Sequence, residues 1–140
     1  MKIYFAGSIR GGRGDSNIYN ELIEYLKKYG DVLTEHVGSK TLTERGEEDG
    51  PSDNYIYSRD MKWIEEADVV IAEVTTPSLG VGYEIGKAED MEKDILCLYR
   101  KGSPKKLSAM INGNPNLKIG VYEGLDDAKK LIDEFFEEIL

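Results

Sequence analysis

Two carboxylates in this sequence stand where an enzyme would place reactive groups. Glu84 follows the apolar run 69–72 and a short loop, in a helix start marked by Gly80 and Gly82. Open α/β sheets bind ligands beyond the carboxyl ends of their strands, and this is where Glu84 is expected. In the first helical turn, the helix dipole would favour a negative charge by ~0.3–1 kcal/mol. We therefore expect Glu84 to be ionised and able to attack as a nucleophile; the plainer alternative is that it only complements the dipole.

The second carboxylate, Asp60, lies on the apolar face of a predicted helix over residues 53–66, capped by Ser52 or Asp53. The apolar stripe consists of Ile56, Trp63, Ile64 and Ala67. A charge on such a face costs several kcal/mol unless it is paired, hydrogen-bonded or protonated. Asp60 is thus the second candidate for chemistry. An ion pair with Arg59, or a capping role, is the structural alternative.

A third feature is the glycine-rich segment 7–14, Gly-Ser-Ile-Arg-Gly-Gly-Arg-Gly, which follows a predicted strand over residues 2–6. Glycines and arginines after a strand suggest a loop that binds an anion. The spacing matches neither a P-loop nor a dinucleotide fingerprint. A flexible turn with solvated arginines is the alternative. Asp15 or Ser16 is expected to cap the next helix.

Alternating strands and helices must position these groups. Apolar runs predict strands over residues 2–6, 32–34, 69–72, 94–99 and 118–122, separated by helical patterns and followed by a last helix over 125–140. This alternation predicts an α/β fold with a five-stranded parallel sheet and helices on both faces. We expect a single domain over residues 1–140. The polar stretch 38–53 is predicted to be a loop that could form a flap, and His36 just before it is either a surface residue or a contact to a base or sugar.

Composition restricts the partners. The net charge of −9 argues against a nucleic-acid polymer or an anionic membrane surface. With one cysteine, Cys97, expected to be a buried thiol, and one histidine, neither a disulfide framework nor a zinc site is expected. We expect no metal and no cofactor. No signal peptide or membrane-spanning run is recognised, so the cytoplasm is the expected location.

A nucleophilic carboxylate next to a second, partly buried carboxyl group is typical of glycosidic bond cleavage. One carboxylate attacks the anomeric carbon, and the other group manages the proton. A buried carboxyl group favours its acid form. An anion loop beside the pair indicates a phosphorylated sugar. The spacing alone names neither the sugar nor the leaving group.

Four blocks of the sequence sharpen this interpretation: YFAGSIRGGRGD (4–15), VLTEHV (32–37), DVVIAEVTTPSLGVGYEIGKA (68–88), and ILCLYRKG with LSAMI (95–111). Together they resemble the 2′-deoxynucleoside 5′-phosphate N-hydrolase family, part of the nucleoside 2-deoxyribosyltransferase superfamily. The resemblance covers most of the chain. It implies a flavodoxin-like three-layer sandwich and a homodimer.

The resemblance also implies residue roles. Glu84 would form a covalent glycosyl intermediate at C1′, Asp60 would protonate the base or orient the nucleophile, and Tyr4 would help to place Glu84. Water would then release 2-deoxyribose 5-phosphate. Ser108 would reach across the dimer to the phosphate of the partner's ligand. The substrate-binding residues implied are Gly7, Ser8, Ile9, Arg10, Gly11, Gly12, Arg13, His36, Ser78, Gly80, Ser108, Ala109 and Met110.

The function expected from the sequence is hydrolysis of 2′-deoxynucleoside 5′-monophosphates at the N-glycosidic bond. Two alternatives stay open: a nucleoside 2-deoxyribosyltransferase and a non-catalytic nucleotide-binding module. The transferase would pass the sugar to another base and needs no phosphate. The binding module would need the anion loop but no pair of carboxylates.

Overall fold

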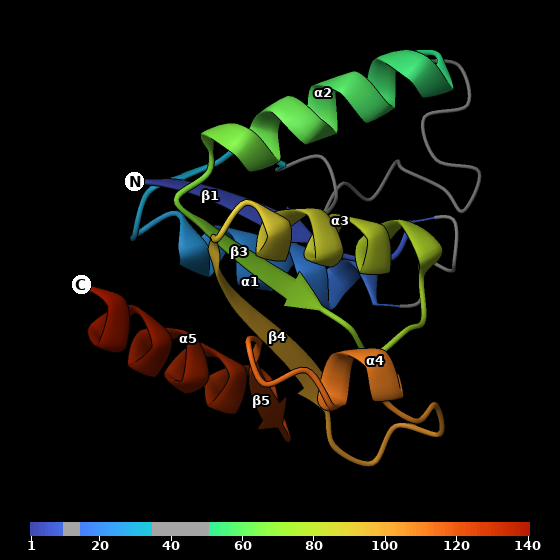
Figure 1. The fold of residues 1–140 in the computed structure, drawn as a ribbon. Helices are drawn as coiled ribbons and strands as arrows, with labels where there is room; N and C mark the ends of the chain where they lie inside the picture. Colours follow the sequence, from blue (N-terminus) through green and yellow to red (C-terminus); the bar gives the residue numbers. More distant parts are fainter. Residues whose placement is uncertain (10–14, 35–50) are drawn as a thin grey trace.

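The computed structural model describes residues 1–9, 15–34 and 51–140 (Figure 1). The helices and strands follow one another as β1 (Lys2–Ala6), α1 (Ser16–Leu26), β2 (Asp31–Val32), α2 (Asp53–Glu66), β3 (Val69–Glu73), α3 (Leu79–Asp90), β4 (Asp94–Arg100), α4 (Ala109–Asn112), β5 (Lys118–Tyr122) and α5 (Leu125–Ile139). The expectations for Arg10, Gly11, Gly12, Arg13, His36 and residues 38–50 lie outside the described residues.

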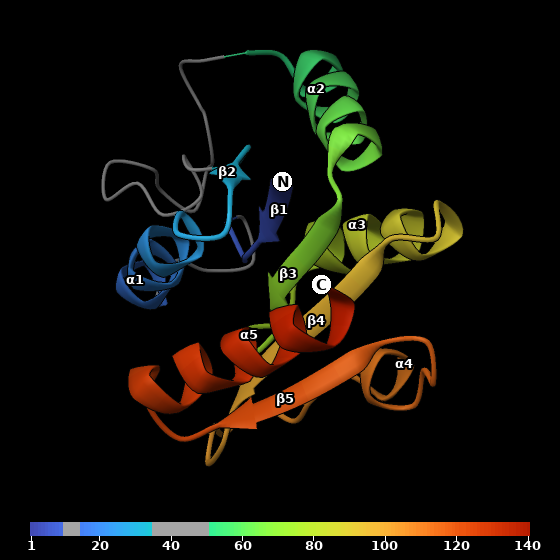
Figure 2. The same cartoon turned by 90° about the vertical axis from the view of Figure 1, so that its left-hand side faces the viewer.

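The strands form one five-stranded sheet in the order β2-β1-β3-β4-β5, and every neighbouring pair is parallel. This confirms the predicted parallel sheet, and the order is that of flavodoxin-like folds. Helices α1 and α5 cover one face, and α2 and α3 cover the other, as Figure 2 shows. The predicted three-layer arrangement is therefore confirmed.

Alternating side chains divide the core between the two faces. In β1, Ile3 and Phe5 pack toward α1 and α5, whereas Tyr4 and Ala6 pack toward α2 and α3. All residues of β3 are buried, as a central strand covered on both faces requires. Cys97 of β4 is the buried thiol that was expected, and burial raises its pKa to about 12.

The second strand is shorter than predicted: β2 ends at Val32 and does not reach Thr34. The Thr34 side chain explains the difference. Its hydroxyl accepts the Phe5 N–H (2.8 Å) and donates to the Phe5 carbonyl (2.7 Å), so at Phe5 a side chain takes the place of strand backbone. Among the described helices, none combines the length and apolar character that a bilayer crossing requires.

Candidate active site

A cleft of about 1110 Å³ opens at the carboxyl edge of the sheet. Its walls come from α2, from the first part of α3, and from the segments that follow β1, β3 and β4. The parallel sheet delivers these segments to one edge, so residues far apart in sequence meet there. Tyr4 of β1, Asp60 of α2 and Glu84 of α3 all line this cleft, so the fold brings these three residues together.

Tyr4 and Glu84 contact each other in the cleft. The Tyr4 hydroxyl donates a short hydrogen bond to Oε2 of Glu84. The Tyr4 ring is buried in the sheet–helix core, with 1% of its surface exposed, so its hydroxyl cannot swing away from the carboxylate. Burial, followed by the neighbouring Glu84 charge, raises the Tyr4 pKa, and the hydroxyl therefore acts as a donor.

The position of Glu84 within α3 differs from the prediction. The Ser78 side chain accepts the Val81 N–H at 3.3 Å, so the helix begins at Leu79 and its first turn contains no acidic residue. Glu84 lies in the second turn, where the dipole is weaker. Burial raises the pKa of Glu84 to about 7, with the Tyr4 hydrogen bond and Arg59 acting against the shift and Asp60 adding to it. The expectation of a carboxylate kept ionised by the dipole was therefore wrong: burial is the larger effect.

Asp60 faces the cleft and is also paired. Its Oδ1 lies 3.0 Å from Nε of Arg59, with side-chain exposures of 15% for Arg59 and 19% for Asp60. The guanidinium of Arg59 in turn stacks over the Trp63 ring, 4.8 Å from its centroid. The ion pair considered as the structural alternative is therefore present, and it lies at the cleft wall, within electrostatic reach of Glu84.

Two serines in the cleft serve as helix N-caps. The Ser78 hydroxyl oxygen accepts the Val81 N–H, and that of Ser108 accepts the Met110 N–H at 3.2 Å. A capping hydroxyl uses its oxygen as acceptor and keeps its hydrogen available for a ligand oxygen. Both serines can thus donate to an anion without giving up their caps. Gly80 also lines the cleft, where the nearest atom to an added Cβ would be Ser78 Oγ at 3.9 Å.

The described part of the glycine-rich segment has mixed roles. Gly7 and Ile9 line the cleft, whereas Ser8 is fully buried and its backbone N–H donates to the Tyr19 hydroxyl at 3.1 Å. A Cβ at Gly7 would lie 3.0 Å from the Tyr19 ring, so packing alone requires a small residue there.

Ser108 and Met110 line the same cleft as Glu84 within one chain. Met110 is 82% exposed, and Ala109 between them is exposed as well.

Sequence reasoning missed several wall residues. Ile56, Tyr57 and Met61 of α2 line the cleft, as does Lys106 before α4. Ile56 and Tyr57 precede Asp60 by four and three residues, so this helical spacing was the available signal for them. Met61 lies four residues after Tyr57. Arg59 was considered only as a partner for Asp60, although it also lines the cleft.

This arrangement suits displacement at an electrophilic carbon. The Tyr4 hydroxyl holds Oε2 of Glu84, and the pKa of Glu84 near 7 gives an ionised fraction at neutral pH. Asp60, a second carboxyl group beside Glu84, can donate or accept a proton. The hydroxyls of Ser78 and Ser108 can receive an anionic end of the ligand.

Known proteins match both the sequence and the fold. The family model described as nucleoside 2-deoxyribosyltransferase matches residues 3–124. A protein of Esox lucius named 5-hydroxymethyl-dUMP N-hydrolase is 59% identical, covering 98% of this chain and 97% of the relative. A Mus musculus protein of the same name is 55% identical and covers 99% of this chain and 81% of its own.

A solved structure extends the comparison to the fold. The Clostridium botulinum CMP N-glycosidase BcmB superposes with a TM-score of 0.69 at 20% identity, covering 96% of this chain and 99% of its own. At that identity the match concerns the fold alone.

Proposed function

This chain belongs to the nucleoside 2-deoxyribosyltransferase family, and from that premise we propose that it hydrolyses the N-glycosidic bond of 2′-deoxynucleoside 5′-monophosphates. The observation that carries the proposal is the Tyr4–Glu84 hydrogen bond inside a cleft shared with Asp60. A tyrosine hydroxyl that fixes one carboxylate beside another is suited to a covalent glycosyl mechanism.

In the proposed first step, an ionised Glu84 oxygen attacks C1′ of the deoxyribose. The C1′–N bond breaks, its electron pair leaves with the base, and Asp60 supplies a proton to the base or orients Glu84. In the second step, water attacks C1′ of the glycosyl-Glu84 ester and gives a proton to the Asp60 carboxylate. The bond from C1′ to the Glu84 oxygen breaks, which returns the Glu84 carboxylate and releases 2-deoxyribose 5-phosphate. A 2′-hydroxyl would destabilise the oxocarbenium-like transition state, which favours deoxy substrates.

The phosphate end of the substrate is proposed to lie against the N-termini of α3 and α4. The hydroxyls of Ser78 and Ser108 support this placement, since both caps retain a donor toward the cleft. Backbone groups of Gly7 to Arg13 and the Arg10 side chain stay part of the proposal on the strength of the sequence. His36 stays a proposed contact to the base.

The names of the relatives suggest which base to test. Several relatives between 47% and 59% identical are named 5-hydroxymethyl-dUMP N-hydrolase. We propose 5-hydroxymethyl-dUMP as the first candidate substrate, with dGMP and the ribonucleotides as comparisons. The apolar wall residues Ile56 and Met61 provide a surface for a flat base.

We also propose that the enzyme is a cytoplasmic homodimer in which Ser108 serves the partner's site. Exposed apolar side chains near the cleft support a partner surface: Leu79 is 97% exposed and Met110 is 82% exposed. Within one chain, Ser108 already lines the cleft of its own Glu84, so the two arrangements need an experiment to separate them.

The family model's name favours one alternative, transfer of deoxyribose to another base. A transferase would exchange bases between unphosphorylated nucleosides, whereas the proposed hydrolase requires the 5′-phosphate. Incubating deoxyadenosine with a foreign base and analysing the nucleosides by chromatography distinguishes them. Exchange without phosphate would favour the transferase.

The proposal is tested by replacing the nucleophile. Glu84→Ala is expected to abolish base release from 5-hydroxymethyl-dUMP and dGMP, a loss of at least about a thousandfold in kcat, because the variant lacks the carboxylate that forms the ester. Chromatographic detection of free base measures it. Undiminished turnover would rule out the nucleophilic role, and nucleotide binding without turnover by the unaltered protein would favour the non-catalytic module.

A further inference from the structure

A second buried acid, Glu73, lies at the end of β3 and has no part in the proposed chemistry. It is fully buried, yet its carboxylate has several donors. Oε1 accepts the Thr75 N–H at 2.7 Å, and Oε2 accepts the Thr75 hydroxyl at 3.0 Å and the Tyr122 hydroxyl. A buried ionisable group is costly unless such bonds satisfy it, so the fold holds this carboxylate in one place.

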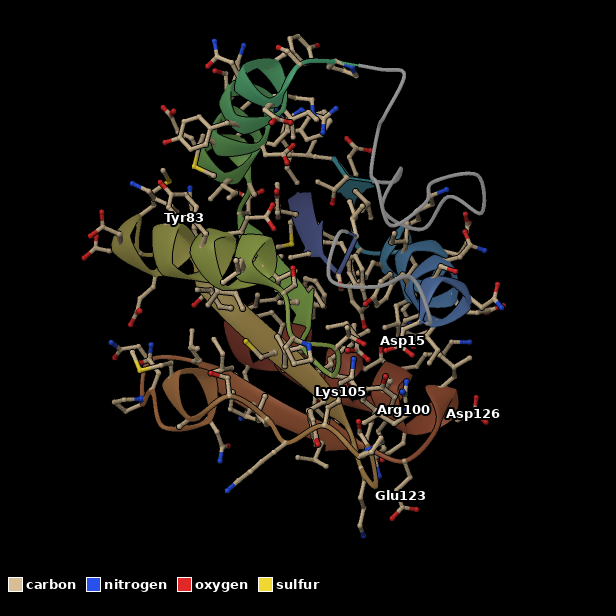
Figure 3. All side chains as sticks on the ribbon, turned by 90° about the vertical axis from the view of Figure 1, so that its right-hand side faces the viewer. Asp15, Tyr83, Arg100, Lys105, Glu123 and Asp126 are labelled. Atoms are coloured by element: carbon tan, nitrogen blue, oxygen red, sulfur yellow. The ribbon has the colours of Figure 1, made fainter. Side chains whose placement is uncertain are left out.

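The contacts continue from Thr75 to the ends of other elements. The Arg100 N–H donates to the Thr75 hydroxyl oxygen at 2.9 Å, and the Arg100 guanidinium lies 3.0 Å from Oδ1 of Asp15. The Thr76 hydroxyl donates to Oδ2 of Asp15 at 3.2 Å. Figure 3 shows Asp15 and Arg100 at the same edge of the molecule, well away from Tyr83 on α3.

Asp15 does not cap α1, although it occupies the N-cap position that the sequence predicted for it or Ser16. No side-chain capping bond forms; both of its carboxylate oxygens turn instead toward Arg100 and Thr76. The acid thus ties the start of α1 to the segment after β3. We call Asp15, Glu73, Thr75, Thr76, Arg100 and Tyr122 the edge network.

The edge network holds the segment 74–78, which forms one wall of the cleft, through contacts on the side of that segment that faces away from the cleft. Val74, Thr76, Pro77 and Ser78 line the cleft, whereas Thr75 between them is 2% exposed and joins Glu73. The segment 74–78 leads directly into α3, whose first N–H groups and capping Ser78 face the phosphate end in the proposed function. Glu84, in contrast, is held by Tyr4 of β1.

We propose that Glu73 and Thr75 are positioning residues for the 5′-phosphate: without touching the ligand, they set where segment 74–78 and the Ser78 hydroxyl lie. This inference rests on the proposed function, because it takes the ligand to be a nucleoside monophosphate. Two groups of residues would then position different parts of one site. The edge network would position the segment that binds the phosphate, and Tyr4 would position Glu84, which reacts with the sugar.

A matched pair of substitutions at Thr75 tests the proposal. Thr75→Val keeps the shape but removes the hydroxyl that links Glu73 to Arg100, whereas Thr75→Ser keeps the hydroxyl. The substitution removes both hydrogen bonds of that hydroxyl, and a loss of one net hydrogen bond in ligand binding corresponds to roughly a three- to tenfold change. We expect Thr75→Val to raise KM for the nucleotide by about that factor with kcat within about twofold, and Thr75→Ser to behave as the unaltered protein.

Inhibition by the unphosphorylated nucleoside provides the second readout. Its inhibition constant is expected to be unchanged in Thr75→Val, because the altered contact concerns the phosphate end alone. Equal weakening of nucleotide and nucleoside, or an unchanged nucleotide KM, would overturn the proposal. Thermal unfolding of each variant fixes a temperature at which all are folded.

Three further outcomes are decisive. If Thr75→Val does not fold, Glu73→Gln, which keeps the size of the side chain but removes its charge, is expected to show the same rise in KM. If neither variant folds, the edge network serves stability and the positioning role is wrong. If the unaltered protein releases no base from any nucleotide, the proposed function fails; calorimetric dGMP binding to Thr75→Val and Thr75→Ser then still decides the positioning role.

Discussion

At the scale of single residues, the Tyr4 hydroxyl sets the charge of Glu84. Its hydrogen bond lowers the pKa of Glu84 against the larger effect of burial. In Tyr4→Phe the pKa of Glu84 is therefore expected to rise above 7. The pH at which kcat/KM is half-maximal on the acid side should move upward, and activity below that pH should fall by roughly tenfold for each pH unit by which the profile moves.

A matched control exists on the opposite face of the sheet. The Tyr25 hydroxyl donates to Asp133 at 2.6 Å, also a tyrosine–carboxylate contact, but outside the cleft. Tyr25→Phe should leave the pH profile of base release unchanged. A Tyr4→Phe profile that coincides with that of Tyr25→Phe would contradict the assignment.

At the residue scale, some functional properties could be predicted from the sequence and others could not. Asp60 was identified because a charge on an apolar helix face needs an explanation, and the structure supplies one in Arg59 and the cleft. The raised pKa of Glu84 could not be predicted, since it depends on how far the surrounding core buries the carboxyl group. That burial is a property of packing between segments distant in sequence.

At the scale of elements, α3 contains glycines whose cost to the helix can be measured. An added Cβ at Gly82 or Gly86 would meet no described atom within 4 Å. Glycine inside a helix costs roughly 0.5–1 kcal/mol relative to alanine. Both Gly82→Ala and Gly86→Ala are therefore expected to raise the free energy of unfolding by about that amount in urea titrations.

The two substitutions should differ in activity, because Gly82 lines the cleft and Gly86 does not belong to its described lining. We expect Gly82→Ala to raise KM for the nucleotide several-fold, whereas Gly86→Ala should keep the original kinetics. Retained kinetics in Gly82→Ala would show that the ligand does not approach the backbone there.

The sequence predicted the elements well and their ends less well. The buried run of β3 and the amphipathic pattern of α5 identify those elements directly. The predicted start of α3 was too late because it was taken from the glycines, whereas the cap at Ser78 starts the helix at Leu79. A cap is one hydrogen bond between a side chain and the backbone, and hydrophobic periodicity does not predict it.

At the scale of the whole molecule, the raised pKa of Glu84 makes folding stability depend on pH. The folded protein holds this proton up to about pH 7, whereas an unfolded glutamate releases it near 4.5. The stabilisation is complete below 4.5 and is lost as pH rises through 7, and it amounts to roughly 3 kcal/mol. The free energy of unfolding of Glu84→Gln minus that of the unaltered protein should therefore be larger at pH 8 than at pH 5.

Urea unfolding of both proteins at the two pH values measures this difference. Titrating groups that do not interact with Glu84, including Glu73, occur in both proteins and cancel in the comparison. A stability difference that does not change with pH would mean that Glu84 titrates normally in the folded protein.

The proposed dimer makes a further prediction at this scale. If Ser108 serves the partner's site, mixing Ser108→Ala with Glu84→Ala subunits restores one competent site in each mixed dimer. Activity should then recover to about half that of the unaltered protein in those dimers. If each chain uses its own Ser108, the mixed dimer has no complete site, and the mixture stays as impaired as its components.

Both chain termini lie on the side of the molecule opposite α4 in Figure 1, because β1 begins at the amino edge of the sheet and α5 returns to it. A fluorescent reporter, an affinity handle or a surface-immobilisation linker can therefore be fused to either end without obstructing the opening through which a nucleotide enters.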